Sequence, residues 1–239
     1  MGTSRTPEKA EIKDYPLIAL DITSDESVKN AFEQIKEKLD TIDVLINFAG
    51  FSVCGALIDT TVEEMQKQFE VNLFGFHRVV RTVVPIMQKQ EKGGLIIHTG
   101  SIGGRLAIPY QSLYSASKAA LALYTDALRM ELNDTNVKFT LIEPGDTATD
   151  FHAGRHFVQG FENDPKAQRA IEIMHESESK GDDPIIVAKK IYKIMKTKKP
   201  KPRYTVGSQA FWVGIGLRLL PFSMIEKATL GEYSKKKKK

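Results

Sequence analysis

Residues 43–50 read Asp-Val-Leu-Ile-Asn-Phe-Ala-Gly, and this stretch decides the fold class. Its apolar run is too short for a helix, and the small and polar residues after it are typical of a turn. A brief, wholly apolar run of this kind is typical of a strand buried on both faces of a parallel sheet. We therefore expect a strand at 44–47 whose carboxyl end presents Asn47, Ala49 and Gly50.

Short apolar runs and longer helical stretches alternate along the rest of the chain. We expect strands at 16–20, 44–47, 95–97, 137–142 and 203–206, and helices at 25–39, 62–88, 112–132 and 183–195. In the first of these helices, Val28, Phe32 and Ile35 follow one another at helical spacing, and Ser24 is a candidate N-cap. The alternation predicts an α/β fold built on a doubly wound, Rossmann-like parallel sheet.

Composition and charge narrow the class of protein. The chain of 239 residues is 41% apolar and 27% charged, which excludes a disordered chain. The net charge of +4 comes from residues 235–239, which are all lysine; without them 29 basic residues face 30 acidic ones. We therefore expect a single domain at 1–234, a polylysine tail at 235–239 and no nucleic-acid partner. Cys54 is the only cysteine, which indicates a reducing, cytoplasmic compartment.

The apolar segment 211–225, near the end of the chain, allows two interpretations. Gly214, Gly216 and Pro221 interrupt it, and it is too short to cross a bilayer. The first fifteen residues are polar and show no signal peptide. We favour a loose terminal segment that closes the fold, followed by a solubilising tail. The alternative is a membrane-surface contact in which the lysines meet anionic lipid.

Small and polar residues follow four of the expected strands. They are Asp21, then Asn47 to Gly50, then Thr99 to Ser101, and then Pro144 to Thr149. Each group by itself is typical of a turn. Ligands of such sheets bind outside the carboxyl ends of the strands, so four groups on one edge favour a binding crevice.

Residues 114–118 read Tyr-Ser-Ala-Ser-Lys within an expected helix. Positions four apart share a helix face, so Tyr114 and Lys118 lie side by side. A lysine cation within ~4–6 Å lowers the pKa of a phenol from its usual value near 10, which favours proton exchange with a substrate oxygen. Ser101, just past a strand, could hydrogen-bond the same oxygen.

Together these motifs resemble those of the short-chain dehydrogenase/reductase family over about residues 3–206. Asp21-Ile22-Thr23 is similar to the family's Asp-apolar-Thr element, whose first two residues border the adenine of the cofactor. Residues 43–50 resemble its Asn-Asn-Ala-Gly strand end, with Phe48 in place of the second Asn. Asn47, Ala49 and Gly50 would then line the cofactor.

The resemblance implies hydride transfer between a nicotinamide cofactor and a small carbonyl or alcohol substrate. Tyr114 would exchange the hydroxyl proton, and Ser101 would orient the substrate oxygen. Lys118 would lower the pKa of Tyr114 and bind the nicotinamide ribose. Asn72, in Val-Asn-Leu-Phe-Gly, matches the family's mid-helix catalytic Asn and would hold a water that connects Lys118 to solvent.

The loop after residue 142 also matches the family. Pro144, Gly145, Thr147 and Thr149 correspond to the loop that holds the nicotinamide carboxamide. The segment 149–183, where the family builds its substrate lid, is rich in apolar residues. A steroid, retinoid or fatty-acyl-like substrate would fit such a lid, and ordinary loop packing explains it equally well.

One departure from the family pattern concerns the start of the chain. The family's first strand, glycine-rich turn and first helix are absent from the sequence, and this turn supplies backbone N–H groups to the pyrophosphate. Residues 2–5 resemble the end of the family's second strand, where Arg5 would meet the 2′-phosphate of NADP. NAD is the alternative cofactor, and an exposed terminal arginine is the alternative interpretation of Arg5.

The missing unit leaves two classes of function open. The first is an NADP-dependent oxidoreductase. The second is a noncatalytic remnant or regulatory partner that keeps Ser101, Tyr114 and Lys118 without a cofactor site. The family often dimerises through helices that correspond to 62–88 and 112–132, so we expect a homodimer or homotetramer. His152 and His156 stand four apart without an evident third ligand, and we expect no metal.

Overall fold

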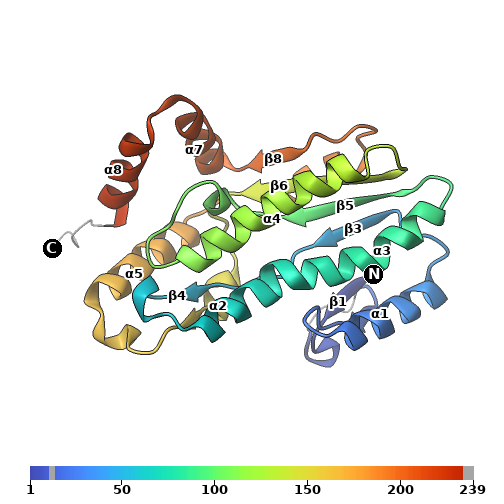
Figure 1. Cartoon of the computed structure of the whole chain (residues 1–239), viewed down its shortest axis with the longest axis horizontal. Helices are drawn as coiled ribbons and strands as arrows, with labels where there is room; N and C mark the ends of the chain where they lie inside the picture. The colour runs from blue at the N-terminus through green and yellow to red at the C-terminus, as the bar shows by residue number, and fades with distance from the viewer. Residues whose placement is uncertain (11–13, 234–239) are drawn as a thin grey trace.

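The computed structural model describes residues 1–10 and 14–233; the polylysine tail expected at 235–239 lies outside them. Four parallel strands form the central sheet in the order β3-β5-β6-β8 (Figure 1). They are β3 (Val44–Asn47), β5 (Gly94–Thr99), β6 (Val137–Pro144) and β8 (Arg203–Val206). The expected α/β class with a parallel sheet is confirmed.

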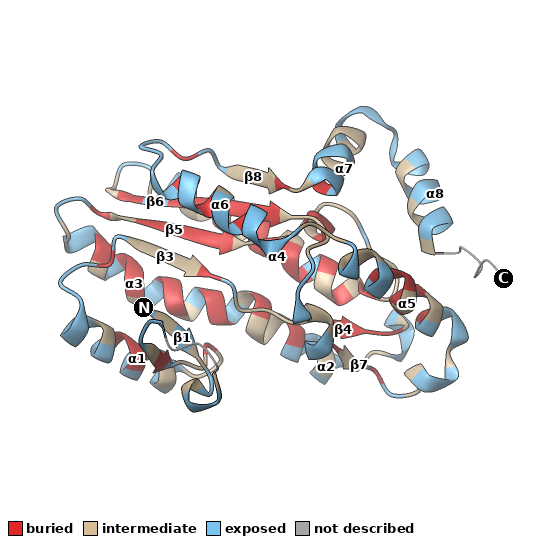
Figure 2. Cartoon of the chain, turned by 180° about the vertical axis from the view of Figure 1, so that it is seen from behind, coloured by how far each residue is buried: buried red, intermediate tan, exposed pale blue. Residues whose placement is uncertain are grey.

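Helices cover both faces of this sheet. Helices α3 (Gly75–Lys89) and α4 (Ser112–Glu131) lie on one face, with α1 (Asp25–Lys38) beside α3, and α6 (Pro184–Met195) lies on the other (Figures 1 and 2). The Ser24 side chain accepts a hydrogen bond from the backbone N–H of Ser27 and caps α1, as its position before the helix suggests. The two covered faces account for the unbroken apolar runs Val44 to Ile46 in β3 and Leu95 to Ile97 in β5.

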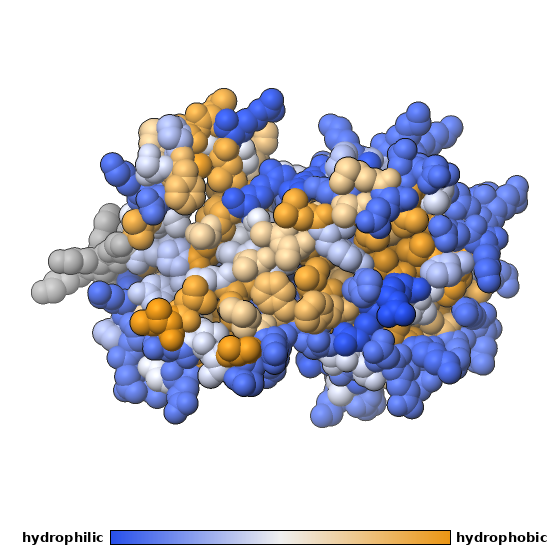
Figure 3. Space-filling view, viewed as in Figure 1, coloured by the Kyte–Doolittle hydropathy of each residue, from blue (hydrophilic) through white to orange (hydrophobic). Residues whose placement is uncertain are grey.

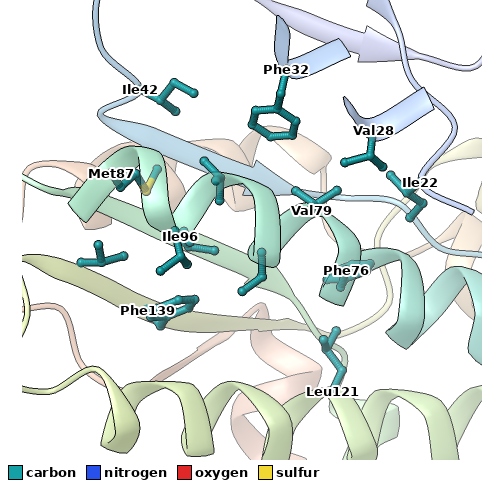
Figure 4. Packing of buried hydrophobic residues seen from close by; sticks show 14 of the residues in the cluster. Ile22, Val28, Phe32, Ile42, Phe76, Val79, Met87, Ile96, Leu121 and Phe139 are labelled. Carbon is teal, nitrogen blue, oxygen red and sulfur yellow. The ribbon is translucent and has the colours of Figure 1, made fainter. Parts of the chain in front are cut away.

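Strand β5 shows how the core divides between the two faces. Successive side chains of a strand point to opposite sides. Ile96 therefore packs with Val79 and Phe139 in the cluster under α3 and α4, which Figure 4 shows. Leu95 and Ile97 pack on the other face against residues of α6. This double burial holds the carboxyl end of β5, where Ser101 follows, in a fixed place.

Strands β1 (Gly2–Ser4) and β2 (Leu17–Ala19) pair with each other in a separate parallel sheet. Within the described residues, no strand pairing joins β1 to β3. Strand β2 thus has a pairing partner on one of its two edges. Among the described strands of these two sheets, β1, β2, β3 and β8 each have one unpaired edge, and open edges of this kind invite further pairing.

The expected continuous helix at 62–88 is interrupted. It consists of α2 (Val62–Phe69), a π-helical turn η3 (Glu70–Phe74) and α3. A π-turn inserts one extra residue into a helix and is frequent at functional sites. Here it contains Asn72, whose buried side chain makes three hydrogen bonds.

Several elements were not expected. Strand β4 (Val53–Cys54) pairs with β7 (His156–Phe157), and α5 (Pro165–Ser179), α7 (Ser208–Leu219) and α8 (Phe222–Tyr233) follow them in the chain. Short 3-10 turns are η1 (Pro7–Lys9), η2 (Leu57–Asp59), η4 (Ile102–Gly104), η5 (Asp150–Gly154) and η6 (Phe161–Asn163).

The interpretation of Gly214 and Gly216 as part of a loose segment is wrong, since both lie inside α7. Backbone hydrogen bonds between helical turns and packing against η4 and β8 hold this segment in a helix despite its glycines. None of the helices within the described ranges is long and apolar enough to cross a membrane.

Candidate active site

A cavity of about 670 Å³ opens beyond the carboxyl ends of β5 and β6. Eight of the residues selected from the sequence line it: Gly50, Ser101, Tyr114, Lys118, Pro144, Gly145, Thr147 and Thr149. The structure thus brings the tyrosine–lysine pair, the serine and two strand-end groups to one place. The other selected residues, Arg5, Asp21, Ile22, Asn47, Ala49 and Asn72, do not line this cavity.

Tyr114 and Lys118 face the cavity from one side of α4. Lys118 is buried, and its Nζ atom donates a hydrogen bond to the carbonyl oxygen of Thr99, at 2.8 Å. The same Nζ lies 5.7 Å from the centre of the Tyr114 ring. On its other side the Tyr114 ring contacts Phe151, at 5.7 Å between ring centres. The helix spacing therefore produces the expected pair, and strand β5 fixes its lysine.

Burial shifts the pKa values of both residues of this pair. Burial raises the pKa of Tyr114 to about 12, and a hydrogen bond with Ser101 opposes this only in part. Burial also lowers the pKa of Lys118 to about 8. Loss of solvent disfavours the charged form of both groups. Burial is thus the main influence on the pKa of Tyr114, and the lowering of this pKa by Lys118 stays a prediction.

Ser101 is held by the turn that follows it. Its Oγ accepts a hydrogen bond from the backbone N–H of Gly103, at 3.0 Å, and caps η4. A Cβ atom at Gly104 would lie only 2.8 Å from the carbonyl carbon of Lys118. The absence of a side chain at Gly104 thus allows this turn to approach the backbone of α4 closely, which brings Ser101 beside Tyr114.

Asn72 supports the site from behind the cavity. Its Oδ1 accepts from the backbone N–H of Phe51, and its Nδ2 donates to the carbonyl of Phe51 and to Ser117 Oγ, at 3.0–3.1 Å. A Cβ atom at Gly50 would lie 3.4 Å from Asn72 Oδ1 and 3.5 Å from Lys118 Nζ. Because both amide hydrogens are engaged, only Oδ1 remains to accept a hydrogen bond from a water beside Lys118.

The residues expected around the adenine lie apart from the cavity. Asp21 accepts hydrogen bonds from the backbone and hydroxyl of Thr23, which lower its pKa, and the charge of the exposed Arg5 adds to this effect. The side chain of Ile22 lies in the core, and Ala49 packs against the same cluster. Asn47 is buried, and its Nδ2 atom has no hydrogen-bond partner.

The residues around the cavity fit the nicotinamide end of a dinucleotide. Gly50 leaves open space beside Lys118, and the loop from Pro144 to Thr149 borders the same space. Within residues 1–10 and 14–233, no glycine-rich turn stands between β1 and β3 to receive the pyrophosphate. The described residues therefore fit the nicotinamide end of the dinucleotide but provide no site for its pyrophosphate.

A buried ion pair at the cavity was not expected from the sequence. Arg155 Nη2 donates to Glu178 Oε1 at 2.5 Å, and Glu178 lines the cavity. Burial raises the pKa of Glu178, and the Arg155 charge opposes this. The two residues belong to no motif, so only the fold reveals the pair. Asp146, also at the cavity, accepts hydrogen bonds from Ser177 and Gln209.

The two histidines at spacing four make separate contacts. The His152 ring packs against His175, at 4.2 Å between ring centres, and His156 Nε2 lies 3.1 Å from Glu64 Oε1. Among the residues that the structure describes, no group of three or more His, Cys, Asp and Glu side chains could hold a metal ion.

We predict that Lys118→Met stabilises the chain at neutral pH. Between pH 8 and 10.5 the unfolded chain keeps a proton on Lys118 that the folded chain has lost, so the free energy of unfolding of the wild type rises with pH across this window. The variant lacks this dependence. Its advantage, up to about 3 kcal/mol at pH 7, shrinks as the pH approaches 10.5.

Urea unfolding at several pH values measures this difference. Lys138→Met, on the exposed side of β6, is the matched control, and its stability relative to wild type is expected to stay constant over the same range. A Lys118→Met variant that is less stable than wild type at every pH would contradict the proposed cost of burying this cation.

Comparison with known proteins supports one family. The short chain dehydrogenase family model matches residues 5–156. A 3-ketodihydrosphingosine reductase of Bacteroides thetaiotaomicron is 38% identical over 210 residues, which cover 86% of this chain and 77% of the relative. A probable short-chain type dehydrogenase/reductase of Helicobacter pylori, VdlC, is 35% identical over 214 residues, with the same coverage of both chains.

Solved structures of short-chain dehydrogenases have the same fold as this chain. A short-chain dehydrogenase from Streptomyces avermitilis superposes with a TM-score of 0.76 at 26% identity, over 97% of this chain and 86% of that one. A short-chain dehydrogenase/reductase from Burkholderia phymatum, in complex with NAD, has a TM-score of 0.75 at 21% identity, over 89% and 76%. The chain therefore belongs to the short-chain dehydrogenase/reductase family, whose members are NAD(P)-dependent oxidoreductases.

Proposed function

We propose that this chain reduces the carbonyl group of an apolar, fatty-acyl-like ketone with NADPH. The observation that carries the proposal is the meeting of Ser101, Tyr114 and Lys118 at one cavity, beside the loop from Pro144 to Thr149. The bound cofactor would supply the hydride, and the residues of the chain would hold both reactants and deliver the proton.

The proton is the contribution of Tyr114. Its raised pKa keeps the phenol protonated at neutral pH, which suits donation to the oxygen of a carbonyl group as that oxygen gains charge. Ser101 would donate a second hydrogen bond to the same oxygen. Lys118 would bind the nicotinamide ribose, and below its pKa of about 8 its positive charge would also favour the phenolate that remains after the transfer.

The walls of the cavity favour an apolar substrate. Side chains from four separate parts of the chain line it, among them Ile108, Phe151, Met174 and Leu217. An apolar cavity with a few placed polar groups is typical of a small-molecule site. The relative named 3-ketodihydrosphingosine reductase supports a long-chain ketone over a steroid or retinoid.

Activity is best measured in an extended chain, which we define as residues 1–239 with the glycine-rich strand, turn and helix of a family member fused ahead of Met1. We expect NADPH consumption with a long-chain 3-ketone and much slower consumption with a short-chain analogue, because burial of each additional methylene contributes ~0.8 kcal/mol. Equal kcat/KM values for the two ketones would contradict the substrate class.

The proposed preference for NADPH rests on Arg5, which is exposed and lies close enough to Asp21 to lower the pKa of that carboxyl. Only NADPH carries a 2′-phosphate, and a charge-assisted hydrogen bond contributes ~1.5–3 kcal/mol. In the extended chain, Arg5→Ala should therefore weaken NADPH binding about tenfold to a hundredfold and leave NADH binding nearly unchanged.

Titration calorimetry with both cofactors measures this effect. Lys9→Ala removes one positive charge from an exposed position nearby and is the control for a general charge effect. An equal loss of NADPH and NADH affinity in Arg5→Ala would show that Arg5 does not select the cofactor.

We further propose a homodimer or homotetramer and a cytoplasmic location. Leu123 and Met130 on α4, and Phe74 at the end of the π-turn, are large apolar side chains exposed to solvent, which supports a partner subunit over these helices. The buried free thiol of Cys54 fits a reducing compartment.

A further inference from the structure

Helices α7 and α8 expose an unusual amount of apolar surface. Trp212 is 68% exposed and Phe222 is 76% exposed. We call the exposed apolar side chains of these helices the α7–α8 platform: Phe211, Trp212, Leu219, Phe222, Met224 and Leu230. Figure 3 shows apolar side chains gathered on both helices, at the upper left. Apolar patches of this kind on a folded chain mark interaction sites.

The same two helices also have an apolar inner side. Val213, Leu217 and Ile225 line the cavity. Ala210 is the one buried residue of α7, and α8 has none. Helix α7 is apolar on both sides, and such a helix is normally covered on all sides. Packing within the described chain covers the inner side of α7 alone. Its outer side, and the exposed apolar side chains of Phe222, Met224 and Leu230 on α8, are left for another apolar surface to cover.

The platform is attached to the body of the protein at both ends. Helix α7 packs against β8 and against η4, the turn that Ser101 caps. Near the end of α8, Tyr233 packs against Ala170, Ile171 and Met174 of α5. These contacts hold the platform in place as one wall of the cavity.

The sequence that follows these helices is strongly basic. On the helices themselves, exposed Arg218 and Lys227 are balanced in number by exposed Glu226 and Glu232. Residues 235–239, which begin two positions after the end of α8, are five consecutive lysines. Aromatic and aliphatic side chains next to a lysine cluster are the combination that binds anionic membrane surfaces.

We propose that the α7–α8 platform docks on an anionic lipid bilayer. The side chains of Trp212 and Phe222 enter the boundary between headgroups and acyl chains, and the lysines meet the anionic headgroups. Because the inner side of the same helices lines the cavity, docking places the cavity next to the lipid phase. This last consequence rests on the proposed function; the docking itself does not.

A second copy of the chain fits the platform less well. It could cover the apolar side chains, but at a two-fold interface each patch meets its own counterpart. A second copy brings the same five lysines and the same net positive charge, and no anionic surface to match them. A lipid surface covers the apolar side chains and neutralises the lysines as well, so the charge favours the bilayer.

Trp212 makes a direct test possible, because it is the only tryptophan of the chain. Residues 1–239 are mixed with vesicles of phosphatidylcholine, with or without a minority of phosphatidylserine. We expect a blue shift of tryptophan emission and co-sedimentation with the anionic vesicles, both reduced by high salt. Unshifted emission together with protein that stays in the supernatant would overturn the proposal.

Three variants separate the contribution of the apolar side chains to vesicle binding from that of the lysines. Trp212→Glu/Phe222→Glu should bind anionic vesicles at least about tenfold more weakly. A chain that ends at Ser234 should bind about a hundredfold more weakly, since each lysine near the surface contributes. Ile58→Glu/Val62→Glu introduces the same two charges at exposed apolar positions elsewhere, 94% and 64% exposed, and should bind as wild type does.

Circular dichroism establishes that each variant is folded, and co-sedimentation is the measure because the double variant lacks the fluorophore. Equal binding by the double variant and wild type would overturn the proposal. A second result would also overturn it: wild type does not bind the vesicles and sediments as a dimer, whereas the double variant sediments as a monomer. The platform would then be a contact between two copies of the chain.

Discussion

Replacing Tyr114 with phenylalanine in the extended chain lowers the rate of ketone reduction by about 10²–10⁴-fold. The substitution removes only the hydroxyl, so the ring contact with Phe151 and the position beside Lys118 stay as they are. What is lost is the proton that the raised pKa of Tyr114 keeps in place at neutral pH. Single-turnover reduction with saturating NADPH measures this step directly, and KM for the ketone is expected to change little.

Tyr124→Phe is the matched control for this prediction. Tyr124 lies on the same helix α4, and its hydroxyl is 2.8 Å from His77 Nδ1, away from the residues that line the cavity. Its variant should keep the turnover of wild type. Near-normal turnover in Tyr114→Phe, with Tyr124→Phe also unaffected, would exclude Tyr114 as the proton donor.

Short-range sequence patterns were enough to predict the bounds of two strands and the position of the tyrosine–lysine pair. The strands at 44–47 and 203–206 have the predicted bounds, because a run of four residues between turn residues such as Gly and Pro is too short for a helix. The four-residue spacing also placed Tyr114 and Lys118 on one side of α4. These features depend only on the local geometry of the chain, so they can be predicted from a single sequence.

Features that depend on the surroundings could not be predicted. The π-turn at Asn72 adds one residue to a helix whose apolar positions already tolerate spacings of three and four, so periodicity does not reveal it. The pKa of Tyr114 depends on burial by distant segments, which a spacing of four does not measure. Helix α7 lacks a one-sided apolar pattern because both of its sides are apolar, and it was therefore taken for a loose segment.

The second prediction with a large expected effect concerns stability and cofactor binding when a strand, turn and helix are added between β1 and β3. Each of these strands has an unpaired edge within the described residues. In the extended chain, the added strand should pair with both edges and the added helix should cover one face of the sheet, which raises the melting temperature without ligand. The added turn should also supply the N–H groups that bind pyrophosphate.

Thermal melts with and without NADPH therefore distinguish the two chains. Residues 1–239 should melt broadly, with no shift on addition of NADPH. The extended chain should gain about 2.7 kcal/mol of stability at a hundredfold excess of NADPH over Kd. Valine in place of the turn glycines of the added unit is the control, because it keeps the added strand and helix but blocks the approach of the phosphates. A sharp melt of residues 1–239 that shifts upward with NADPH would contradict the prediction. Absence of any shift in the extended chain would instead favour the alternative function, a noncatalytic partner that keeps Ser101, Tyr114 and Lys118 without binding a cofactor.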